Sequence, residues 1–335
     1  MGTVEELAIN SPRRPSWRNR PVFVTGATGL LGSRVVAGLV DSGAEVVCLV
    51  RDGVPRSNFH ILGLADRVVT VRGELEDGRL LERILNEYEV EVVLHLGAQT
   101  IVGASHRSPL SSFESNIRGT WHVLEACRLT PSIKAIVVAS SDKAYGEQEV
   151  LPYTEEMALQ ARNPYDVSKA AAEMLTRSYH HAYDLPVGIT RCGNLYGGGD
   201  LNFSRLVPGT IRSVLLGERP VIRSDGSLVR DYLYVDDAAS ALLALGESLV
   251  NSPALAGTAF NISAEEPATV LEMTSLVLEV MGSELQPDVR DEAHHEIQRQ
   301  YLSAARAHSL LGWRPAVPTR EAVTRTVDWY RDYLQ

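Results

Sequence analysis

Short apolar segments alternate with amphipathic ones along the first half of the chain. Five runs rich in Val, Ile and Leu have the length and composition of buried strands: 21–26, 44–50, 67–74, 90–98 and 133–140. Between them, 30–43, 78–89 and 113–129 carry apolar residues at helical spacing. Strands that are apolar throughout and separated by helices are typical of a parallel sheet covered on both faces. Because such crossovers are right-handed, we predict an α/β fold with a doubly wound parallel Rossmann sheet.

The character of the chain changes after residue 183. Segments 197–209 and 251–270 are rich in Gly, Pro, Asn and Ser, whereas 186–192 and 230–237 have the pattern of strands that return to the sheet. We therefore expect a flexible N-terminal arm at 1–20, a dinucleotide-binding Rossmann domain at 21–183 and a smaller C-terminal α/β lobe, mainly substrate-binding, at 184–335.

Composition narrows the class of protein. The 335 residues carry a net charge of −10, which disfavours nucleic-acid binding because neutralising phosphates requires a basic face. Apolar runs stay well below the ~20 residues that cross a bilayer, so we expect no membrane partner. Cys48, Cys127 and Cys192 lie far apart and have the pattern of reduced core thiols. These features, and an N-terminal segment without an apolar signal core, predict a cytoplasmic protein.

The histidines give no indication of a metal site. His95 falls within a buried strand, and we expect it to be a hydrogen-bonded core residue. His294 and His295 are adjacent in a polar run, without further ligands at metal spacing. We therefore predict no metal.

A glycine-rich loop joins the first predicted strand to the first predicted helix. In TGATGLLG, Gly26, Gly29 and Gly32 have the spacing GxxGxxG. Glycine permits the tight turn, and the pyrophosphate of a dinucleotide can then reach main-chain N–H groups at the helix N-terminus. The position of this loop favours a dinucleotide site over a simple tight turn.

The ends of the second and third strands bear on the choice of cofactor. NAD sites usually place an acidic residue after the second strand, for the ribose 2′-hydroxyl, but here Val50 is followed by Arg51. A guanidinium suits a 2′-phosphate, so we expect NAD or NADP with NADP slightly favoured, while Asp52 keeps NAD open. Glu74 either contacts the adenine or caps the following helix.

A tyrosine and a lysine follow the fifth strand at helical spacing. Tyr165 and Lys169 share a helix face as positions i and i+4. A nearby ammonium lowers the pKa of a phenol, which would let the tyrosine act as a base near neutral pH. Together with Ser141 after the fifth strand and Asn116 in ESNIRGT, this pair resembles the extended short-chain dehydrogenase/reductases, over nearly the whole chain. The resemblance implies that Ser141 orients a substrate hydroxyl.

Asp142 and Lys143 indicate which branch of that family the chain resembles. Segments 95–120, 140–146 and 191–209 resemble nucleotide-sugar 4,6-dehydratases, most closely the CDP-glucose type, which carries Asp-Lys where the dTDP-glucose type carries Asp-Glu. Epimerases of the family usually have small or apolar residues there. The resemblance therefore implies a dehydratase; a nucleotide-sugar 4-epimerase and a non-catalytic NADP-sensing regulator are the alternatives. From the residues alone, the pair is otherwise a solvated ion pair of little energetic value.

The resemblance also implies a division of chemistry. Tyr165, helped by Ser141 and Lys169, takes the proton of the sugar 4-hydroxyl while hydride passes from carbon 4 to the nicotinamide, to be returned at carbon 6 after water is lost. Asp142 is then the acid that protonates the departing 6-hydroxyl, and Lys143 the base that takes the carbon 5 proton. Lys143 has to be neutral for this step, which burial and the charge of Lys169 favour and an ionised Asp142 opposes.

Binding residues and a dimer follow from the same resemblance. We expect the cofactor to contact Gly26, Thr28, Gly29, Leu30, Leu31, Gly32, Arg51, Glu74, Leu75, Leu96, Ala98, Asn116, Tyr165 and Lys169. The nucleotide-diphosphate sugar is expected to contact Gln99, Asn194, Arg205, Arg230 and Tyr301, with Arg299 an alternative to Tyr301. Helices at 112–129 and 165–183 resemble those of a four-helix dimer interface, so we expect a homodimer.

Overall fold

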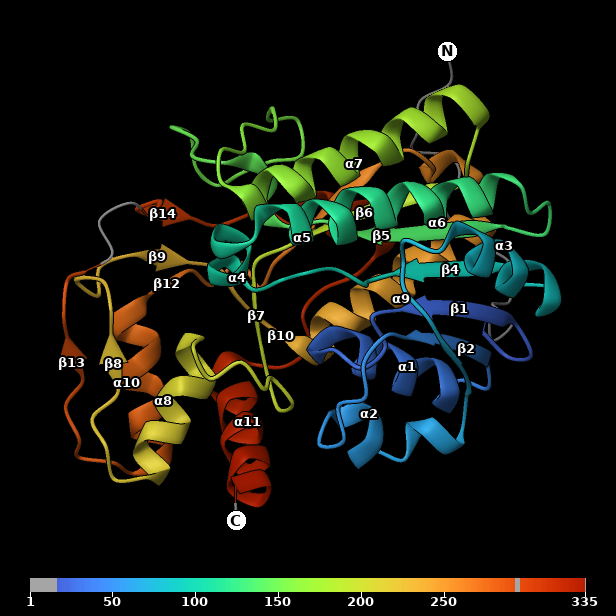
Figure 1. Cartoon of the computed structure of the whole chain (residues 1–335). Coiled ribbons are helices and arrows are strands. Elements are labelled where there is room, and N and C mark those ends of the chain that lie inside the picture. The colour runs from blue at the N-terminus through green and yellow to red at the C-terminus, as the bar shows by residue number, and fades with distance from the viewer. Residues whose placement is uncertain (1–16, 293–295, 335) are drawn as a thin grey trace.

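The central sheet has the strand order of a doubly wound fold. The computed structural model describes residues 17–292 and 296–334, so most of the expected arm at 1–20 and both His294 and His295 lie outside the described residues. Within these residues, seven parallel strands run in the order β11-β6-β5-β4-β1-β2-β3 (Figure 1). They are β1 (Pro21–Thr25), β2 (Glu45–Val50), β3 (Val69–Arg72), β4 (Val92–His95), β5 (Ala135–Ala139), β6 (Val187–Cys192) and β11 (Ala259–Ile262). The α/β fold and the first six strands are confirmed.

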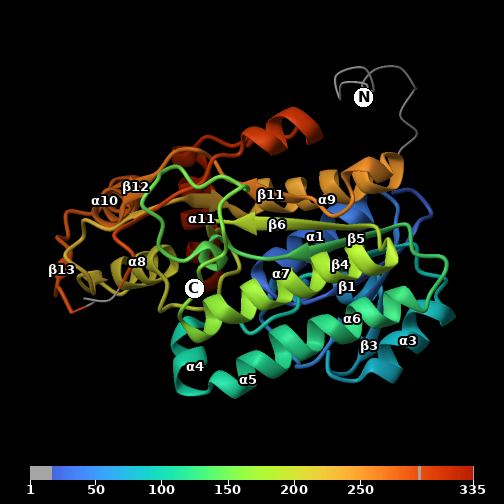
Figure 2. The same ribbon diagram turned by 90° about the horizontal axis from the view of Figure 1, so that it is seen from above.

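Helices cover both faces of this sheet (Figure 2). On one face, α1 and α9 bury Val35, Leu39 and Leu242 against the strands; on the other, α3 and α6 bury Leu81 and Val123. The helices of this region are α1 (Leu30–Asp41), α2 (Asn58–Ile61), α3 (Gly78–Glu87), α4 (Val102–Arg107), α5 (Pro109–Phe113), η3 (Glu114–Arg118), α6 (Gly119–Arg128), α7 (Pro164–Tyr183) and α9 (Val235–Asn251), with short η2 (Leu64–Asp66), η4 (Asp142–Tyr145) and η5 (Pro253–Leu255). The sheet is therefore packed between two separate apolar cores, one on each face.

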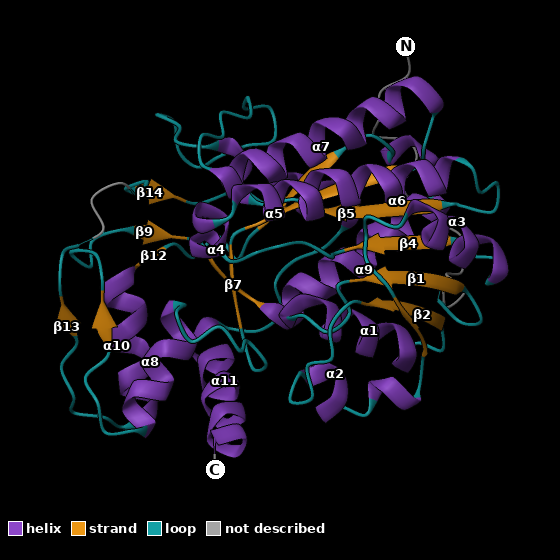
Figure 3. Cartoon of the chain, viewed as in Figure 1, coloured by secondary structure: helices purple, strands orange, loops and turns teal. Residues whose placement is uncertain are grey.

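A smaller lobe lies beyond the carboxyl ends of the strands (Figure 3). Its core includes Tyr196, Ile211, Val277 and Val327. Its elements are β7 (Asn194–Tyr196), α8 (Leu206–Leu215), β8 (Val221–Ile222), β9 (Val229–Arg230), β10 (Tyr232–Tyr234), β12 (Ala268–Thr269), α10 (Val270–Met281), β13 (Asp288–Val289), β14 (Arg299–Gln300) and α11 (Thr319–Leu334). Its short strands pair in small sheets of two or three. The short η6 (Ala307–Leu311) packs instead on the central sheet, against α9 and β11.

Residues 230–237, expected to return to the central sheet, do not join it. Arg230 belongs to β9, which pairs with β12 and β14, and β10 pairs with β7. The seventh strand is instead β11, inside the segment 251–270, which is rich in Gly, Pro, Asn and Ser and for which no strand was predicted. With four residues, β11 is too short to show a pattern in sequence, and its position depends on pairing with β6.

Candidate active site

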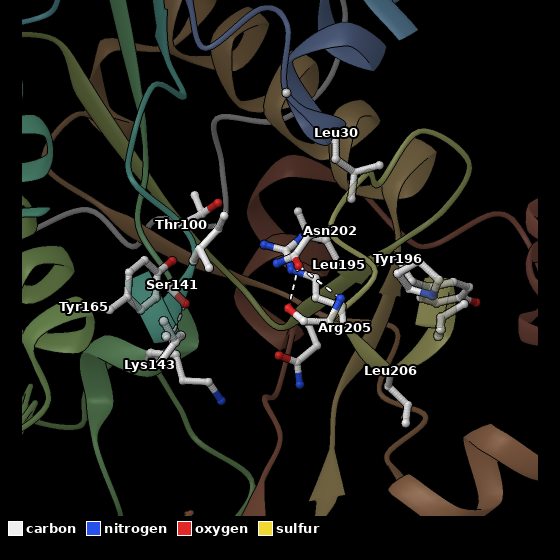
Figure 4. Close-up of a pocket in the computed structure, with 18 of the residues that line it drawn as sticks. Leu30, Thr100, Ser141, Lys143, Tyr165, Leu195, Tyr196, Asn202, Arg205 and Leu206 are labelled. Carbon is white, nitrogen blue, oxygen red and sulfur yellow. Dashed lines mark hydrogen bonds between the residues drawn. The ribbon is translucent and has the colours of Figure 1, made fainter. Parts of the chain in front are cut away.

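The strand order reverses between β4 and β1, and a crevice at such a point is where doubly wound sheets bind ligands. A cavity of about 1400 Å³ lies there and extends into the small lobe. In Figure 4, Thr100, Ser141, Lys143 and Tyr165 lie on one side of this cavity, and Asn202, Arg205 and Leu206 lie across from them. Residues from both lobes therefore face one space.

The glycine loop between β1 and α1 forms one end of the cavity. Gly26 has a positive φ of 74°, and a Cβ there would come within 2.7 Å of the Gly97 nitrogen. A Cβ on Gly32 would overlap the Gly26 carbonyl oxygen. Gly29 is the N-cap of α1 and no side chain caps that helix, so the first-turn N–H groups face the cavity uncapped. The loop thus fits a dinucleotide pyrophosphate.

Most of the expected cofactor residues line the cavity, and two do not. Those that line it are Gly26, Thr28, Gly29, Leu30, Leu31, Gly32, Arg51, Leu75, Leu96, Ala98, Tyr165 and Lys169. Glu74 is exposed outside the cavity lining of the described residues, and it is Asp77, not Glu74, whose side chain caps α3 by accepting from Leu80 N at 3.0 Å. Glu76, which the sequence did not single out, does line the cavity.

Asn116 is buried in η3 behind the cavity wall. Its Oδ1 accepts from Gln99 N at 2.7 Å, and its Nδ2 donates to Gln99 O at 3.0 Å and to Ser168 Oγ at 2.8 Å. Among the described residues, neither Asn116 nor Gln99 is part of the cavity lining. Asn116 and Gln99 brace the segment after β4 against α7. The expected contacts of Asn116 with the cofactor and of Gln99 with the substrate stay predictions.

Arg51 lies at the cavity mouth and is paired with its neighbour. Its Nε is 2.6 Å from Asp52 Oδ2, and both side chains are more than half exposed. Arg51 and Asp52, the two residues that left the choice between NAD and NADP open in the sequence, thus interact with each other. An exposed pair of this kind is weak. Asp52 can therefore turn to a ribose 2′-hydroxyl, and Arg51 can turn to a 2′-phosphate.

Ser141, Asp142 and Lys143 form the turn after β5, where η4 begins. Ser141 Oγ donates to Asp142 Oδ1 at 3.0 Å and accepts from Lys143 N at 3.2 Å. Lys143 Nζ lies 3.7 Å from Asp142 Oδ2. The Asp142 side chain is buried, and its Oδ2 has no hydrogen-bond partner among the described residues. The pair is therefore no solvated surface ion pair: both side chains line the cavity.

Tyr165 and Lys169 are presented by α7, which starts at Pro164 with Asn163 as its N-cap. Both side chains are buried and both line the cavity. Lys169 Nζ donates to Ala139 O at 2.8 Å. Burial lowers the pKa of Lys169 to about 8.

Burial raises the pKa of Tyr165 to about 12, and the nearby Asp142 adds to this while Ser141 and Arg205 oppose it. The lowered phenol pKa expected from the sequence is therefore not produced by the protein residues. Desolvation of the phenolate outweighs the positive charges around it, and Lys169 is turned to a backbone carbonyl. The positive charge of an oxidised nicotinamide would act in the direction that Tyr165 needs.

Gln300 is a site residue that the sequence reasoning missed. It is fully buried on β14, where Arg299 and Tyr301 on either side point away, as side chains alternate along a strand. Gln300 lines the cavity, whereas Tyr301 is outside the lining of the described residues and its ring lies beside the exposed Arg299. The expected substrate contact of Tyr301, with Arg299 as its alternative, stays a prediction that the position of these two side chains does not support. The alternation in RQYL was the signal that Gln300 faces inward.

Three of the expected substrate residues line the cavity on the small-lobe side: Asn194, Arg205 and Arg230. Arg205 is oriented by Asp200, whose Oδ2 accepts from its Nη1 at 3.0 Å. Arg230 is buried, donates to Val229 O, and pairs with Glu296 at 2.9 Å. Two guanidinium groups are therefore held at the wall of an otherwise acidic protein, where a diphosphate could reach them.

The remaining titratable candidates lie in the core. His95 is buried between Thr25 Oγ1 at 2.8 Å and Thr120 Oγ1 at 3.0 Å, and burial lowers its pKa to about 3, which confirms its interpretation as a neutral core histidine. The three cysteines are free and buried, as expected. In the described part of the chain, His, Cys, Asp and Glu side chains form no group suited to a metal ion, and no helix is long and apolar enough to span a bilayer.

Comparison with known proteins identifies the family to which the chain belongs. Residues 22–263 match the NAD dependent epimerase/dehydratase family, and the chain belongs to that family. A nicotinamide dinucleotide as cofactor is thereby confirmed, while the preference for NADP drawn from Arg51 stays a prediction.

Individual relatives fall on both sides of the epimerase/dehydratase division. CDP-glucose 4,6-dehydratase of Salmonella typhimurium is 30% identical over 334 residues, covering 95% of this chain and 92% of that protein. dTDP-glucose 4,6-dehydratase of Streptomyces antibioticus is 33% identical, covering 93% and 92%. UDP-glucose 4-epimerase of Mycolicibacterium smegmatis is 30% identical, covering 93% and 99%. Overall identity therefore does not separate the two activities.

The similar solved structures also include both epimerases and dehydratases. UDP-glucose 4-epimerase of Thermotoga maritima, solved with UDP-glucose, superposes with a TM-score of 0.85 at 28% identity, covering 94% of this chain and 100% of that one. dTDP-glucose 4,6-dehydratase of Bacillus anthracis, solved with NAD, gives a TM-score of 0.82 at 26% identity, covering 93% and 97%. The residues of the site, and not overall similarity, therefore have to distinguish dehydration from epimerisation.

Proposed function

We propose that the protein is a nucleotide-sugar 4,6-dehydratase, with CDP-glucose as the favoured substrate and an NDP-4-keto-6-deoxyhexose as the product. The observation that carries the proposal is the placement of Asp142 and Lys143: both line the cavity next to Ser141, and Lys143 lies on the same side as Tyr165 (Figure 4). Elimination of water needs an acid and a base beside neighbouring carbons, and epimerisation needs neither. The choice of nucleotide rests on the Asp-Lys pair, which resembles the CDP-glucose type where the dTDP-glucose type carries Asp-Glu; a CDP-glucose 4,6-dehydratase is among the relatives.

The first task of the site is to take a proton from the sugar 4-hydroxyl. Tyr165 is the base for this step, and Ser141, at the N-cap of η4, holds the hydroxyl. Lys169 adds positive charge behind the phenol, from the next turn of α7. A nicotinamide dinucleotide, held at its pyrophosphate by the glycine loop, would supply the hydride chemistry at carbons 4 and 6.

The second task is the elimination. Once carbon 4 is a ketone, the hydrogen on carbon 5 is acidic, and neutral Lys143 takes it as a proton. The electron pair of that C–H bond forms the carbon 5–carbon 6 double bond, and the 6-hydroxyl leaves as water with a proton from Asp142. When hydride is added at carbon 6, Lys143 returns its proton to carbon 5, which restores the single bond between these carbons. Asp142 Oδ2 is buried and accepts no hydrogen bond from the described residues, which leaves it available to a substrate hydroxyl.

The substrate's diphosphate would lie between the catalytic turn and the small lobe. Arg205 and Arg230 are assigned to its charges, and Asn194 to a hydrogen bond with the same ligand. The arrangement supports a division of labour in which residues 21–183 bind the cofactor and 184–335 mainly bind the substrate.

A product assay tests the proposal. The protein, with NAD and separately with NADP, is incubated with CDP-glucose, dTDP-glucose, UDP-glucose, GDP-mannose and UDP-N-acetylglucosamine, and the products are read by mass spectrometry. Loss of one water, greatest with CDP-glucose, is the expected result. A product of unchanged mass with inverted carbon 4 would identify an epimerase, and cofactor binding without turnover of any sugar would contradict both enzymatic assignments.

A further inference from the structure

Gln300 contacts both members of the Asp142–Lys143 pair from a distant part of the sequence. Its Oε1 accepts a hydrogen bond from Lys143 Nζ, and its Nε2 donates to the Asp142 carbonyl oxygen at 3.0 Å. The side chain is fully buried on β14, whereas the catalytic turn follows β5 of the central sheet. The small lobe therefore supplies a polar group to the turn that carries the proposed acid and base.

These two bonds fix the direction of the carboxamide. The nitrogen end of Gln300 has to face Asp142 O, because a carbonyl oxygen only accepts. The oxygen end is thereby turned to Lys143, and the reverse orientation would place an NH₂ group against an amine that is itself a donor. The contact is thus specific for an acceptor at Lys143 and a donor at Asp142.

We infer that Gln300 is a positioning residue that holds Lys143 at the cavity wall with an uncharged acceptor, so that the amine can still give up its proton. An amide oxygen accepts a hydrogen bond from a protonated and from a neutral amine. A carboxylate at the same place would favour the ammonium strongly. The inference rests on the proposed function, in which Lys143 has to be neutral to take the carbon 5 proton.

Several charged and titratable side chains surround the contact between Lys143 and Gln300. Asp142 lies 3.7 Å away on the same turn, and Asp166 and Tyr165 face it from α7. His106 on α4 acts on Asp166 in the same sense as Lys143, and Arg230 lies opposite Gln300 in register on β9, with Glu296 as its partner. Gln300 contacts the Lys143 amine by a hydrogen bond, whereas the Asp142 carboxyl lies 3.7 Å from it, so a carboxylate at position 300 would be the nearest negative charge to that amine.

A titration of the lysines tests the contact directly. The chain has three lysines, Lys134, Lys143 and Lys169, so protein labelled with ¹³C at the lysine ε-carbon gives three signals that Lys134→Arg and Lys143→Arg variants assign. In a Gln300→Glu variant, which is nearly isosteric, the titration midpoint of the Lys143 signal should rise by about one pH unit or more. Lys134 should not move. An unshifted Lys143 signal in the folded variant would overturn the inference.

Gln298→Glu is the matched control. Gln298 lies two residues earlier, is exposed, and donates to Ser227 Oγ at 2.8 Å. It introduces the same charge into the same segment without touching Lys143. If Gln298→Glu shifts the Lys143 signal as much as Gln300→Glu does, the effect is a general field of the added charge, and the specific contact is refuted.

Kinetics then connect the contact to the reaction. In Gln300→Glu, kcat for water loss should fall by about tenfold at neutral pH and recover as the pH is raised, with KM for the nucleotide sugar unchanged. Reduction of the nicotinamide by the sugar, read by absorbance, should persist because that step uses Tyr165. A Gln300→Met variant, similar in size and uncharged, should lower kcat without this pH shift. If the wild-type protein eliminates no water, the proposed function fails, while the titration still decides the contact.

Discussion

At the scale of single residues, lysine is rare in this chain, and where it stands is informative. Three of the 32 basic side chains are lysines, and two of these three, Lys143 and Lys169, line the same cavity. Arginine cannot give up its proton in a protein, whereas lysine can when its surroundings disfavour charge. The cavity thus contains two amines that can change protonation, beside arginines that cannot, Arg205 and Arg230 among them.

The first prediction concerns Lys143. Replacing it with Ala removes the proposed base, so water loss should fall by about 10²- to 10⁴-fold, while the exchange of hydride between substrate and nicotinamide continues. The measurement is a single-turnover experiment that follows nicotinamide absorbance and product mass together. Lys143→Arg is the matched control: it keeps the charge and should be equally defective. Full elimination activity in Lys143→Ala would remove Lys143 from the mechanism.

What sequence could and could not predict at this scale follows from how each residue is placed. Ser141, Asp142 and Lys143 are adjacent, and Tyr165 and Lys169 are one helical turn apart, so local geometry alone brings each group together. Gln300 and the roles of Asn116 and Gln99 depend on contacts between segments distant in sequence, which leave no local pattern. The pKa of Tyr165 was misjudged for the same reason, since burial is a property of the assembled site.

At the scale of elements, a buried ion pair ties α7 to the strand beneath it. Arg191 on β6 and Glu173 on α7 are both almost fully buried, and Arg191 Nε donates to Glu173 Oε2 at 2.9 Å. Arg191 also donates to the hydroxyl of Tyr145, at the end of η4, and Tyr145 donates to Asn261 Oδ1 at 2.7 Å. The network links the helix of Tyr165 and Lys169 to the turn of Asp142 and Lys143.

The second prediction follows from this network. Arg191→Met leaves the Glu173 carboxylate buried without its partner, and should lower the free energy of unfolding by about 3–5 kcal/mol, measured by urea denaturation. Arg177→Met is the matched control, because Arg177 contacts the same carboxylate at 2.9 Å from a partly exposed position; it should cost at most about 1 kcal/mol. Equal losses in the two variants would contradict the assignment of Arg191 as the main partner.

A buried acid joins three further segments. Asp231, between β9 and β10, accepts from Ser263 Oγ at 2.5 Å, just after β11, and from Leu302 N at 3.2 Å, just after β14. Burial raises its pKa from the ordinary 3.8 to about 7, with Asp142 adding to the effect. Folded protein therefore keeps a proton on Asp231 that the unfolded chain gives up over this range.

The third prediction is the pH dependence that this causes. Because the folded-state pKa is raised, the contribution of Asp231 to stability is full below about pH 4 and is lost as the pH rises to about 7, by on the order of 4 kcal/mol. Asp231→Asn removes the titration, so its stability relative to the wild type should increase from pH 4 to pH 8, as measured by urea denaturation across that range. Asp225→Asn, at an exposed position, should show no such trend. A constant difference between Asp231→Asn and the wild type would contradict the prediction.

Elements were predictable where the pattern is long and regular. The strands up to β6 and the amphipathic helices α1 and α3 follow directly from apolar spacing. The seventh strand was missed because Ala259–Ile262 is short and stands in a Gly-rich segment, and 230–237 was misplaced because two strand-like tyrosines there pack within the small lobe. In both cases tertiary pairing decided the structure, and pairing between short strands is not encoded in local pattern.

At the scale of the whole molecule, helices on one side carry apolar side chains that the single chain leaves exposed. Leu110 on α5 is 68% exposed, Met174 on α7 is 64% exposed and Trp121 on α6 is 40% exposed. On the continuous helix through α5, η3 and α6, Leu110, Phe113, Ile117 and Trp121 recur at helical spacing, which makes one stripe. These helices lie side by side on the outer surface (Figures 1 and 2).

A stripe of this kind fits a second copy of the same chain, because two helices from each copy would bury it in an isologous four-helix interface. The fourth prediction is that the protein has twice the 36.6 kDa mass of one chain in size-exclusion chromatography with light scattering. The double variant Leu110→Glu/Met174→Glu places four charges in that interface and should be a monomer that keeps its fold by circular dichroism. Val150→Glu, at a position 66% exposed in a loop, should stay dimeric. A monomeric wild type, or a dimeric double variant, would show that the stripe is no such interface.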